Sequence, residues 1–302
     1  LAPIAAETGV DFLAIKGPAP RDTYEIRKPR VAMYQRYGGG NMDEGWTRLM
    51  FEQFNVPFTS IKDAELTKGK LEARYDVIVL PADSVAAMTG ERPAGGGGRG
   101  GRGGAPSNTP PEFRSGFGAQ GVEALESFVQ NGGTLLTFAQ SGDLPIQRFG
   151  LPLRNIVSGL GSNQFWSPGS TLRVRFDTDH PLAYGMPREG LALFMNGSQV
   201  YEVTSTERSQ DVEVFTNYVD RDILQSGWLL GEQDLLSVRD GVENGVVDLV
   251  LARHVADLDH SHAPHINTCA HHVLIGRAWR RRRTGSGTPR PGPQRRGQSS
   301  TG

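Results

Sequence analysis

Two short runs of apolar residues constrain the fold of this chain more than any other feature. They occupy residues 76–80 (Asp-Val-Ile-Val-Leu) and 134–138 (Thr-Leu-Leu-Thr-Phe), the first ending at Pro81 and the second following Gly132 and Gly133. A strand that lacks alternating polar residues is buried on both faces, which is typical of parallel strands covered by helices. We therefore expect both runs to be central strands of a parallel sheet.

Helical patterns alternate with strands along the first half of the chain. A short strand at 31–36 precedes Asn41, a candidate N-cap whose partner in a capping box is Glu44. Apolar residues at helical spacing then predict one buried stripe, formed by Trp46, Leu49, Met50 and Phe54. Further elements are expected at 58–61 (strand), 64–73 (short helix) and 122–129 (helix). This order predicts an α/β fold with a doubly wound, mostly parallel sheet.

The second half of the chain has the pattern of β structure. Leu172, Val174 and Phe176 alternate with two arginines, as in a half-buried strand. Turn residues separate further β-like runs at 192–195, 199–203, 212–219 and 223–230. We expect these runs to be later strands and edge hairpins of the same domain.

Charge and composition exclude several classes of protein. The 302 residues carry 32 basic and 33 acidic side chains, so a globally basic nucleic-acid binder is not expected. Eight arginines and no acidic residue follow position 276, so the preceding part is net acidic. The single cysteine cannot form an internal disulfide. Since no apolar run approaches the ~20 residues that a membrane span requires, we expect no such span.

A glycine-rich segment between the first strand and the first helix is the candidate ligand site. Backbone N–H groups at a helix N-terminus bind anions, and ligands of α/β sheets bind at the carboxyl ends of the strands. The segment matches neither the dinucleotide-binding nor the P-loop pattern, so a tight turn with Trp46 in the core is the alternative. The candidate ligand-binding residues are Gly38, Gly39, Gly40, Asn41, Asp43, Glu44 and Trp46.

Ser141 and His180 are the candidate catalytic residues. Ser141 follows the strand at 134–138, where a strand-to-helix turn would hold a nucleophile, but its neighbours do not match G-x-S-x-G. His180 is the one histidine outside the C-terminal part, and its Asp-rich, Pro-flanked setting is also typical of a turn. Two interpretations remain open: Ser141 and His180 form a catalytic pair, or each has a structural role in its own turn.

Two further segments have compositions that suggest binding. The insertion at 91–118 contains an RGG-like stretch, which is typical of RNA contact or of a flexible surface loop. The C-terminal part holds imidazole and thiol groups that suit zinc, but it lacks a pattern that would fix them. We interpret metal binding there as adventitious; the residues are His260, His262, His265 and Cys269.

Several motifs, taken in order, resemble a known family. They are Arg30-Val-Ala-Met-Tyr-Gln-Arg-Tyr, Asn41-Met-Asp-Glu-Gly-Trp-Thr-Arg48, Tyr75-Asp-Val-Ile-Val-Leu-Pro81, Gly132-Gly-Thr-Leu-Leu and Asp179-His-Pro-Leu-Ala-Tyr-Gly-Met186. Residues 25–235 thereby resemble the C-terminal region of bacterial secreted zinc carboxypeptidase-like proteins of the carboxypeptidase A type. That region is similar to a class I glutamine amidotransferase-like, flavodoxin-like domain.

The resemblance implies a non-catalytic accessory domain. A working amidotransferase would need a cysteine at the turn after a central strand; this chain has Ser141 near that turn, and its one cysteine lies far downstream. The resemblance places the peptidase chemistry and its zinc in an upstream domain, so no cofactor is expected in this chain. It also implies an extracellular or periplasmic parent, with that upstream domain and a peptide or cell-wall fragment as partners. The alternatives are a degenerate hydrolase that uses Ser141, and a metal- or RNA-binding module.

The expected organisation has three parts. Residues 1–24, which begin without methionine or a signal sequence, are expected to be a linker from a missing upstream domain. Residues 25–235 form the amidotransferase-like domain. Residues 236–302 lose the family pattern and become rich in Arg, Pro, His and Ser. We expect a disordered tail there, produced by a frameshift near 235–255.

Overall fold

The two apolar runs form neighbouring parallel strands at the centre of the fold. The structure, a computed structural model, describes residues 2–8, 14, 16–17, 28–37, 41–91, 110, 113, 115–195, 199–204, 206, 212–232, 247–252 and 272–275. Four parallel strands lie in the spatial order β2-β1-β3-β4. They are β1 (Val31–Tyr34), β2 (Phe58–Ile61), β3 (Val77–Leu80) and β4 (Thr134–Phe138). The predicted parallel sheet is confirmed, and the strands β1 and β3 are buried along their whole length.

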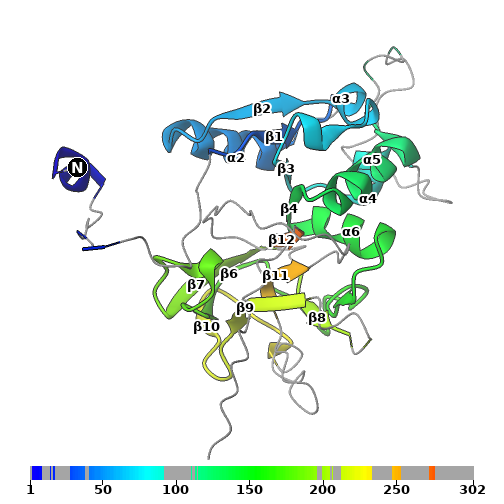
Figure 1. The fold of residues 1–302 in the computed structure, drawn as a ribbon. Coiled ribbons are helices and arrows are strands. Elements are labelled where there is room, and N and C mark those ends of the chain that lie inside the picture. The colour runs from blue at the N-terminus through cyan, green and yellow to red at the C-terminus, as the bar shows by residue number, and fades with distance from the viewer. Residues whose placement is uncertain are drawn as a thin grey trace, which may run out of the picture.

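Helices cover both faces of these strands (Figure 1). One face carries the larger core, which includes Leu125 and Phe128 of α5 packed over Ile78 and Leu135. The other face packs against Phe51 of α2. The helical elements of this half are α2 (Met42–Gln53), α3 (Asp63–Thr67), η1 (Leu71–Ala73), α4 (Val85–Thr89), α5 (Gly118–Gln130), η3 (Ala139–Gly142) and α6 (Asp143–Arg148). The α/β class with helices on both faces is therefore confirmed.

The buried face of α2 differs from the prediction. Helix and N-cap are as expected, but the side chains turned to the interior are Glu44, Thr47 and Phe51. The predicted stripe instead faces solvent, as the exposed fractions of its members show: Trp46 66%, Leu49 40%, Met50 41% and Phe54 73%. The prediction of a buried stripe was wrong, because apolar spacing reveals a helix but not which of its faces meets the sheet.

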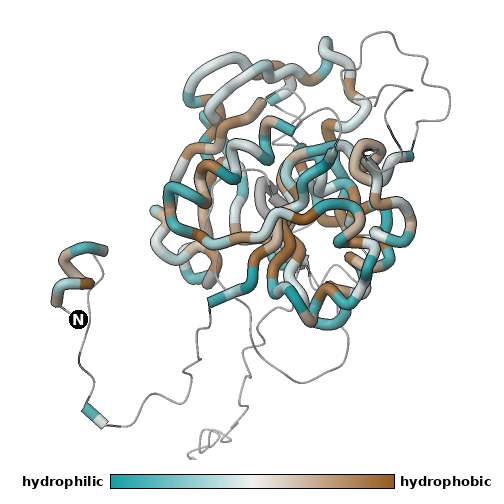
Figure 2. Tube along the Cα trace, turned by 90° about the horizontal axis from the view of Figure 1, so that it is seen from above, coloured by the Kyte–Doolittle hydropathy of each residue, from teal (hydrophilic) through white to brown (hydrophobic). Residues whose placement is uncertain are grey.

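The second half of the chain extends the sheet with antiparallel strands. Its elements are β5 (Leu153–Asn155), β6 (Gly169–Phe176), η4 (Pro181–Ala183), β7 (Glu189–Met195), β8 (Tyr201–Val203), β9 (Val212–Tyr218) and β10 (Leu224–Ser226). β6 pairs with β7, β9 and β10. The alternation in β6 buries Leu172 and Val174 in a separate apolar cluster. Figure 2 shows apolar residues concentrated in the strands of the interior. The expectation of a β-rich second half in the same domain is confirmed.

Two strands from the segment 236–302 join the halves of the sheet. β11 (Val247–Ala252) pairs with β9, and β12 (His272–Ile275) lies between β11 and β4. These residues are short apolar runs that suit a central position. The structure thus differs from the expectation that the chain leaves the fold at 235. The rest of the segment lies outside the described residues, where disorder and the frameshift stay predictions.

The other expected boundaries are only partly covered by the structure. The segment 1–24 contains a helix, α1 (Ala2–Thr8), which lies apart from the sheet in Figures 1 and 2. Most of the insertion 91–118, including its RGG-like stretch, lies outside the described residues. A search of the described residues finds no helix with both the length and the apolar character needed to cross a membrane.

Candidate functional site at the carboxyl edge of the sheet

The carboxyl ends of the parallel strands bring polar residues from distant parts of the chain to one edge. Arg36 follows β1, Lys62 and Asp63 follow β2, and Asp83 follows β3. Parallel strands end at the same edge of a sheet, and that edge is where ligands bind in folds of this class. The contacts among these residues decide which groups a ligand can reach.

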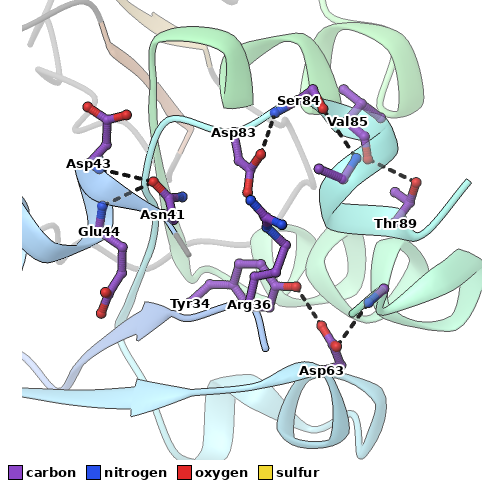
Figure 3. Close-up of polar contacts among 12 residues, drawn as sticks. Tyr34, Arg36, Asn41, Asp43, Glu44, Asp63, Asp83, Ser84, Val85 and Thr89 are labelled. Atoms are coloured by element: carbon purple, nitrogen blue, oxygen red, sulfur yellow. Dashed lines mark hydrogen bonds and ion pairs between the residues drawn. The ribbon is translucent and has the colours of Figure 1, made fainter. Parts of the chain in front are cut away.

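A nearly buried ion pair connects β1 and β3. Arg36 Nε donates to Asp83 Oδ2 at 2.7 Å, and the two side chains are 9% and 12% exposed. Asp83 Oδ1 also accepts from the backbone N–H of Ser84, whose hydroxyl accepts from Ala87 N and caps α4 (Figure 3). Because one partner without the other would be a buried charge, this pair holds the end of β1 against the start of α4.

A second contact ties β1 to the start of α5. The Tyr34 hydroxyl donates to Asp63 Oδ1 at 2.5 Å, and Asp63 Oδ2 accepts from Gly116 N at 2.9 Å. Burial, with the adjacent Asp63 carboxylate, raises the pKa of the Tyr34 hydroxyl well above its usual range. Gly116 has φ +139°, and a Cβ there would stand 2.6 Å from the Gly90 Cα. Only glycine fits this close approach. Because Asp63 binds both the Tyr34 hydroxyl and the backbone of Gly116, Tyr34 and Asp63 fix the framework of the edge.

The groups that remain more accessible lie around Tyr37. The Lys62 ammonium stands 4.1 Å from the centre of the Tyr37 ring and donates to Gln35 Oε1 at 3.1 Å. The ring of Phe113 meets Tyr37 edge-on at 5.8 Å. Tyr37 itself is exposed. A cation held over an aromatic ring offers both charge and an apolar surface to a ligand.

The predicted ligand residues at the start of α2 have different roles. Asn41 Oδ1 accepts from the backbone N–H groups of Asp43 and Glu44, which confirms the predicted cap. The buried Glu44 carboxylate is bound by Arg48 Nη2 at 2.6 Å instead of completing a capping box. Asp43 stays exposed, although partial burial and the charge of Asp83 raise its pKa. Trp46 lies on the solvent face of the helix, and Gly38, Gly39 and Gly40 lie outside the described residues.

The turn after β4 has the geometry of a nucleophile-bearing turn, with an alanine at its apex. Ala139 has φ +45°, a strained value for a residue with a side chain, and it directly follows β4 as the first residue of η3. Its carbonyl accepts from the Tyr201 hydroxyl at 3.2 Å. In α/β hydrolases a sharp, strained strand-to-helix turn of this kind presents the nucleophile. Here the side chain at that position is a methyl group.

Ser141, two residues further on, has a buried hydroxyl that holds this turn together. Its Oγ accepts from Phe138 N at 2.8 Å and lies 2.8 Å from the carbonyl oxygens of Leu80 and Phe138, to one of which it donates. The residue is fully buried. These contacts assign the hydroxyl to the link between β3, β4 and η3.

His180 lies in the other half of the sheet. Its Nδ1 accepts from Leu182 N at 3.2 Å, so Nε2 carries the proton and faces Glu213 Oε2 at 3.3 Å. The ring stacks on Phe215 at 4.6 Å. Glu213 belongs to β9, which β11 and β12 separate from β4, a distance of about 14 Å across three strand spacings. The structure therefore does not bring Ser141 and His180 together.

A second polar surface lies on the antiparallel half. It is a depression of about 660 Å³ lined mainly by charged residues, among them Arg173, Arg175, Glu189, Asp222 and Glu232. Three arginines and four acidic residues share the lining, so their charges offset one another. None of the predicted site residues lines it.

The predicted metal ligands cannot be placed. His260, His262, His265 and Cys269 lie outside the described residues. Within the part of the chain that the structure describes, no group of three or more His, Cys, Asp and Glu side chains is arranged to hold a metal.

The charged residues at the carboxyl edge were not predicted from the sequence, although their positions after the strands could have indicated them. Arg36, Lys62, Asp63 and Asp83 are charged residues within three positions of the end of a parallel strand. In a parallel sheet such residues converge at one edge. The pairing of Arg36 with Asp83, 47 positions apart, required the order of the strands.

Comparisons with known proteins yield matches among solved structures only; no family model and no curated protein matches the chain. A ThuA-like protein from Bacteroides uniformis is 14% identical (TM-score 0.36), with 70% of this chain and 79% of that chain covered. PurLQS from Thermotoga maritima is 15% identical (TM-score 0.38), with 66% and 78% covered. A glutamine amidotransferase from Thermotoga maritima is 11% identical (TM-score 0.37), with 63% and 67% covered. The chain is thus similar to ThuA-like and glutamine amidotransferase structures, and this likeness concerns the fold alone.

Proposed function

We propose that this chain is a non-catalytic accessory domain that binds a peptide or cell-wall fragment at the carboxyl edge of its sheet. The observation that carries the proposal is Ala139. The turn after β4 has the strained backbone that would present a nucleophile, and its side chain is a methyl group without a reactive atom. The hydroxyl of Ser141, two residues further on, is fully buried and engaged by backbone groups of β3 and of the turn.

The ligand class follows from the accessible groups at the edge. Lys62 offers an ammonium group over the face of Tyr37, and Asp43 offers an exposed carboxylate. The carboxylate of a peptide suits the Lys62 ammonium, its amine suits the Asp43 carboxylate, and its apolar side chains suit the Tyr37 ring. Arg36 and Asp83 neutralise each other in the interior and act as the support of this surface.

The parent is proposed to be a secreted zinc carboxypeptidase-like protein, extracellular or periplasmic. The support is the order of sequence motifs in residues 25–235. In this proposal the upstream peptidase domain holds the zinc and performs the hydrolysis, and the present domain packs beside it. The zinc would belong to that upstream domain, and no step of the chemistry is assigned to residues of this chain.

Two measurements test the proposal. Hydrolysis of glutamine and of p-nitrophenyl acetate is compared between the wild type and Ser141→Ala, after circular dichroism shows that both are folded. We expect equal rates at the level of buffer. A wild-type rate that Ser141→Ala abolishes would overturn the proposal in favour of the degenerate hydrolase.

Binding is measured by calorimetric titration with soluble muropeptides. We expect Lys62→Met to weaken binding at least about tenfold, because the charge over Tyr37 is lost. Lys68→Met is the matched control, since this exposed lysine pairs with Glu65 on α3. Absence of binding by the wild type, or an equal effect of both substitutions, would overturn the binding role.

A further inference from the structure

The solvent face of α2 carries more exposed apolar surface than its role in the fold explains. The inner face of the helix covers the sheet through Phe51. The outer face presents five large apolar side chains, with these exposed fractions: Met42 82%, Trp46 66%, Leu49 40%, Met50 41% and Phe54 73%. Contiguous apolar patches larger than a few hundred Å² are uncommon on monomers and mark interaction surfaces. We refer to these five residues as the α2 stripe.

The size of the α2 stripe suits a small protein–protein interface. At these exposed fractions the five side chains present roughly 600 Å² of accessible surface. A standard interface buries roughly 800 Å² per partner, and the lower end of that class about 600 Å². The stripe alone therefore reaches the area that a specific contact with one folded partner needs.

The spacing of the stripe is self-complementary. Met42, Trp46, Met50 and Phe54 follow one another at intervals of four positions, so the row is symmetric about position 48. An antiparallel copy of the same row sets Met42 opposite Phe54 and Trp46 opposite Met50, a smaller side chain against a larger one each time. Rows at this spacing are the ridges that interdigitate in the commonest class of helix packing.

The charges of α2 permit such a contact. Arg48, at the sequence midpoint of the row, lies on the opposite side of the helix from it, on the side of the buried Glu44. Its guanidinium is bound by the buried Glu44 carboxylate of the same helix, with 2.6 Å between Arg48 Nη2 and Glu44 Oε2. The pair therefore lies away from the contact, and the five side chains of the α2 stripe are uncharged.

From these observations we propose that two copies of this chain associate through antiparallel α2 helices around a twofold axis level with the midpoint of the row. The contact is isologous: the same stripe is buried on both copies.

Sedimentation of the full chain over roughly a hundredfold range of concentration tests the association, because a dimer dissociates on dilution. We expect a wild-type dimer, and an increase of the dimer Kd by at least about tenfold for Trp46→Glu. Leu193→Glu, a change at a similarly exposed leucine on β7, is the matched control and should leave the dimer intact. Circular dichroism verifies that both variants are folded.

Disulfide cross-linking tests the arrangement of the two helices. In a Cys269→Ser background, Leu49→Cys lies next to the axis and should form an intermolecular disulfide under mild oxidation. Met42→Cys, placed opposite Phe54 of the other copy, should not. A wild type that stays monomeric throughout would overturn the proposal and leave the stripe to a different protein. A dimer unaffected by Trp46→Glu, or cross-linked by Met42→Cys alone, would also overturn it.

Discussion

Replacing Arg36 by methionine is expected to lower the free energy of unfolding by about 3 kcal/mol, because it leaves the Asp83 carboxylate nearly buried without its cation. Removal of one partner of a buried pair costs about 3–5 kcal/mol. The lower end applies here, since the side chains retain 9% and 12% exposure and water screens part of the charge. Asp83→Asn should also destabilise the protein, because the Arg36 guanidinium loses its contact with this carboxylate.

The double variant, Arg36→Met with Asp83→Asn, separates the ion pair from its surroundings. The amide that replaces the Asp83 carboxylate still offers an oxygen to Ser84 N–H, so the contact at the start of α4 is preserved. With both charges gone, the loss in the double variant should be smaller than the sum of the single losses by at least about 1–2 kcal/mol. Urea unfolding followed by circular dichroism measures each free energy.

An exposed pair provides the control for this cycle. Arg154 and Glu202 bridge β5 and β8 with side chains that are 65% and 22% exposed. The equivalent substitutions there should cost no more than about 1 kcal/mol. If the Arg36 and Asp83 losses are additive, or as small as those of the exposed pair, the supporting role of the buried pair is refuted.

Three further predictions concern stability. Ser141→Ala should lower the free energy of unfolding by about 1–3 kcal/mol through unsatisfied buried backbone groups, and unchanged urea unfolding would contradict this. Gly45→Ala should raise the free energy of unfolding by roughly 0.5–1 kcal/mol, because a Cβ in this helix meets open space. Gly116→Ala should lower it by more than about 1 kcal/mol, because a Cβ there meets the Gly90 backbone. Thermal melts in which Gly45→Ala is less stable than Gly116→Ala would refute this description of the two sites. Hydrogen bonds from Arg30 lower the pKa of Asp76, so Arg30→Gln should destabilise the protein near neutral pH. This destabilisation should disappear as the pH falls through the folded-state pKa of Asp76. Urea unfolding at several pH values measures it, and a destabilisation independent of pH would exclude the linkage.

The elements of the parallel half were largely readable from the sequence. The continuous runs at 76–80 and 134–138 indicated strands buried on both faces, and these strands are neighbours in the sheet. Asn41 indicated the start of α2, where its side chain caps the helix. Such signals are local: they depend on backbone groups and apolar spacing within a few residues.

The face of a helix is not a local property, and there the sequence misled. Trp46 and Phe54 have the spacing of core residues, yet Glu44 and Thr47 face the sheet. Burial of Glu44 is tolerated because Arg48 binds its carboxylate one turn away. Which face of α2 is buried depends on where the sheet lies, and only the tertiary structure shows that.

The candidate site, too, was predicted only in part from the sequence. The sequence indicated the carboxyl edge and the turn after β4. It did not indicate that the Glu44 carboxylate is bound by Arg48, or that Ser141 is buried among backbone groups. These assignments depend on partners such as Leu80, 61 positions away, which only the strand order brings close.

By itself the sequence determined the α/β class, the parallel strands and the N-cap of α2, because strand burial and helix capping are local properties. The tertiary structure decided which side chains share the carboxyl edge, which face of α2 meets solvent, and where β11 and β12 enter the sheet. The physical reason is that burial and ion pairing are set by contacts between segments far apart in the chain, and these contacts exist only once the strands have taken their order.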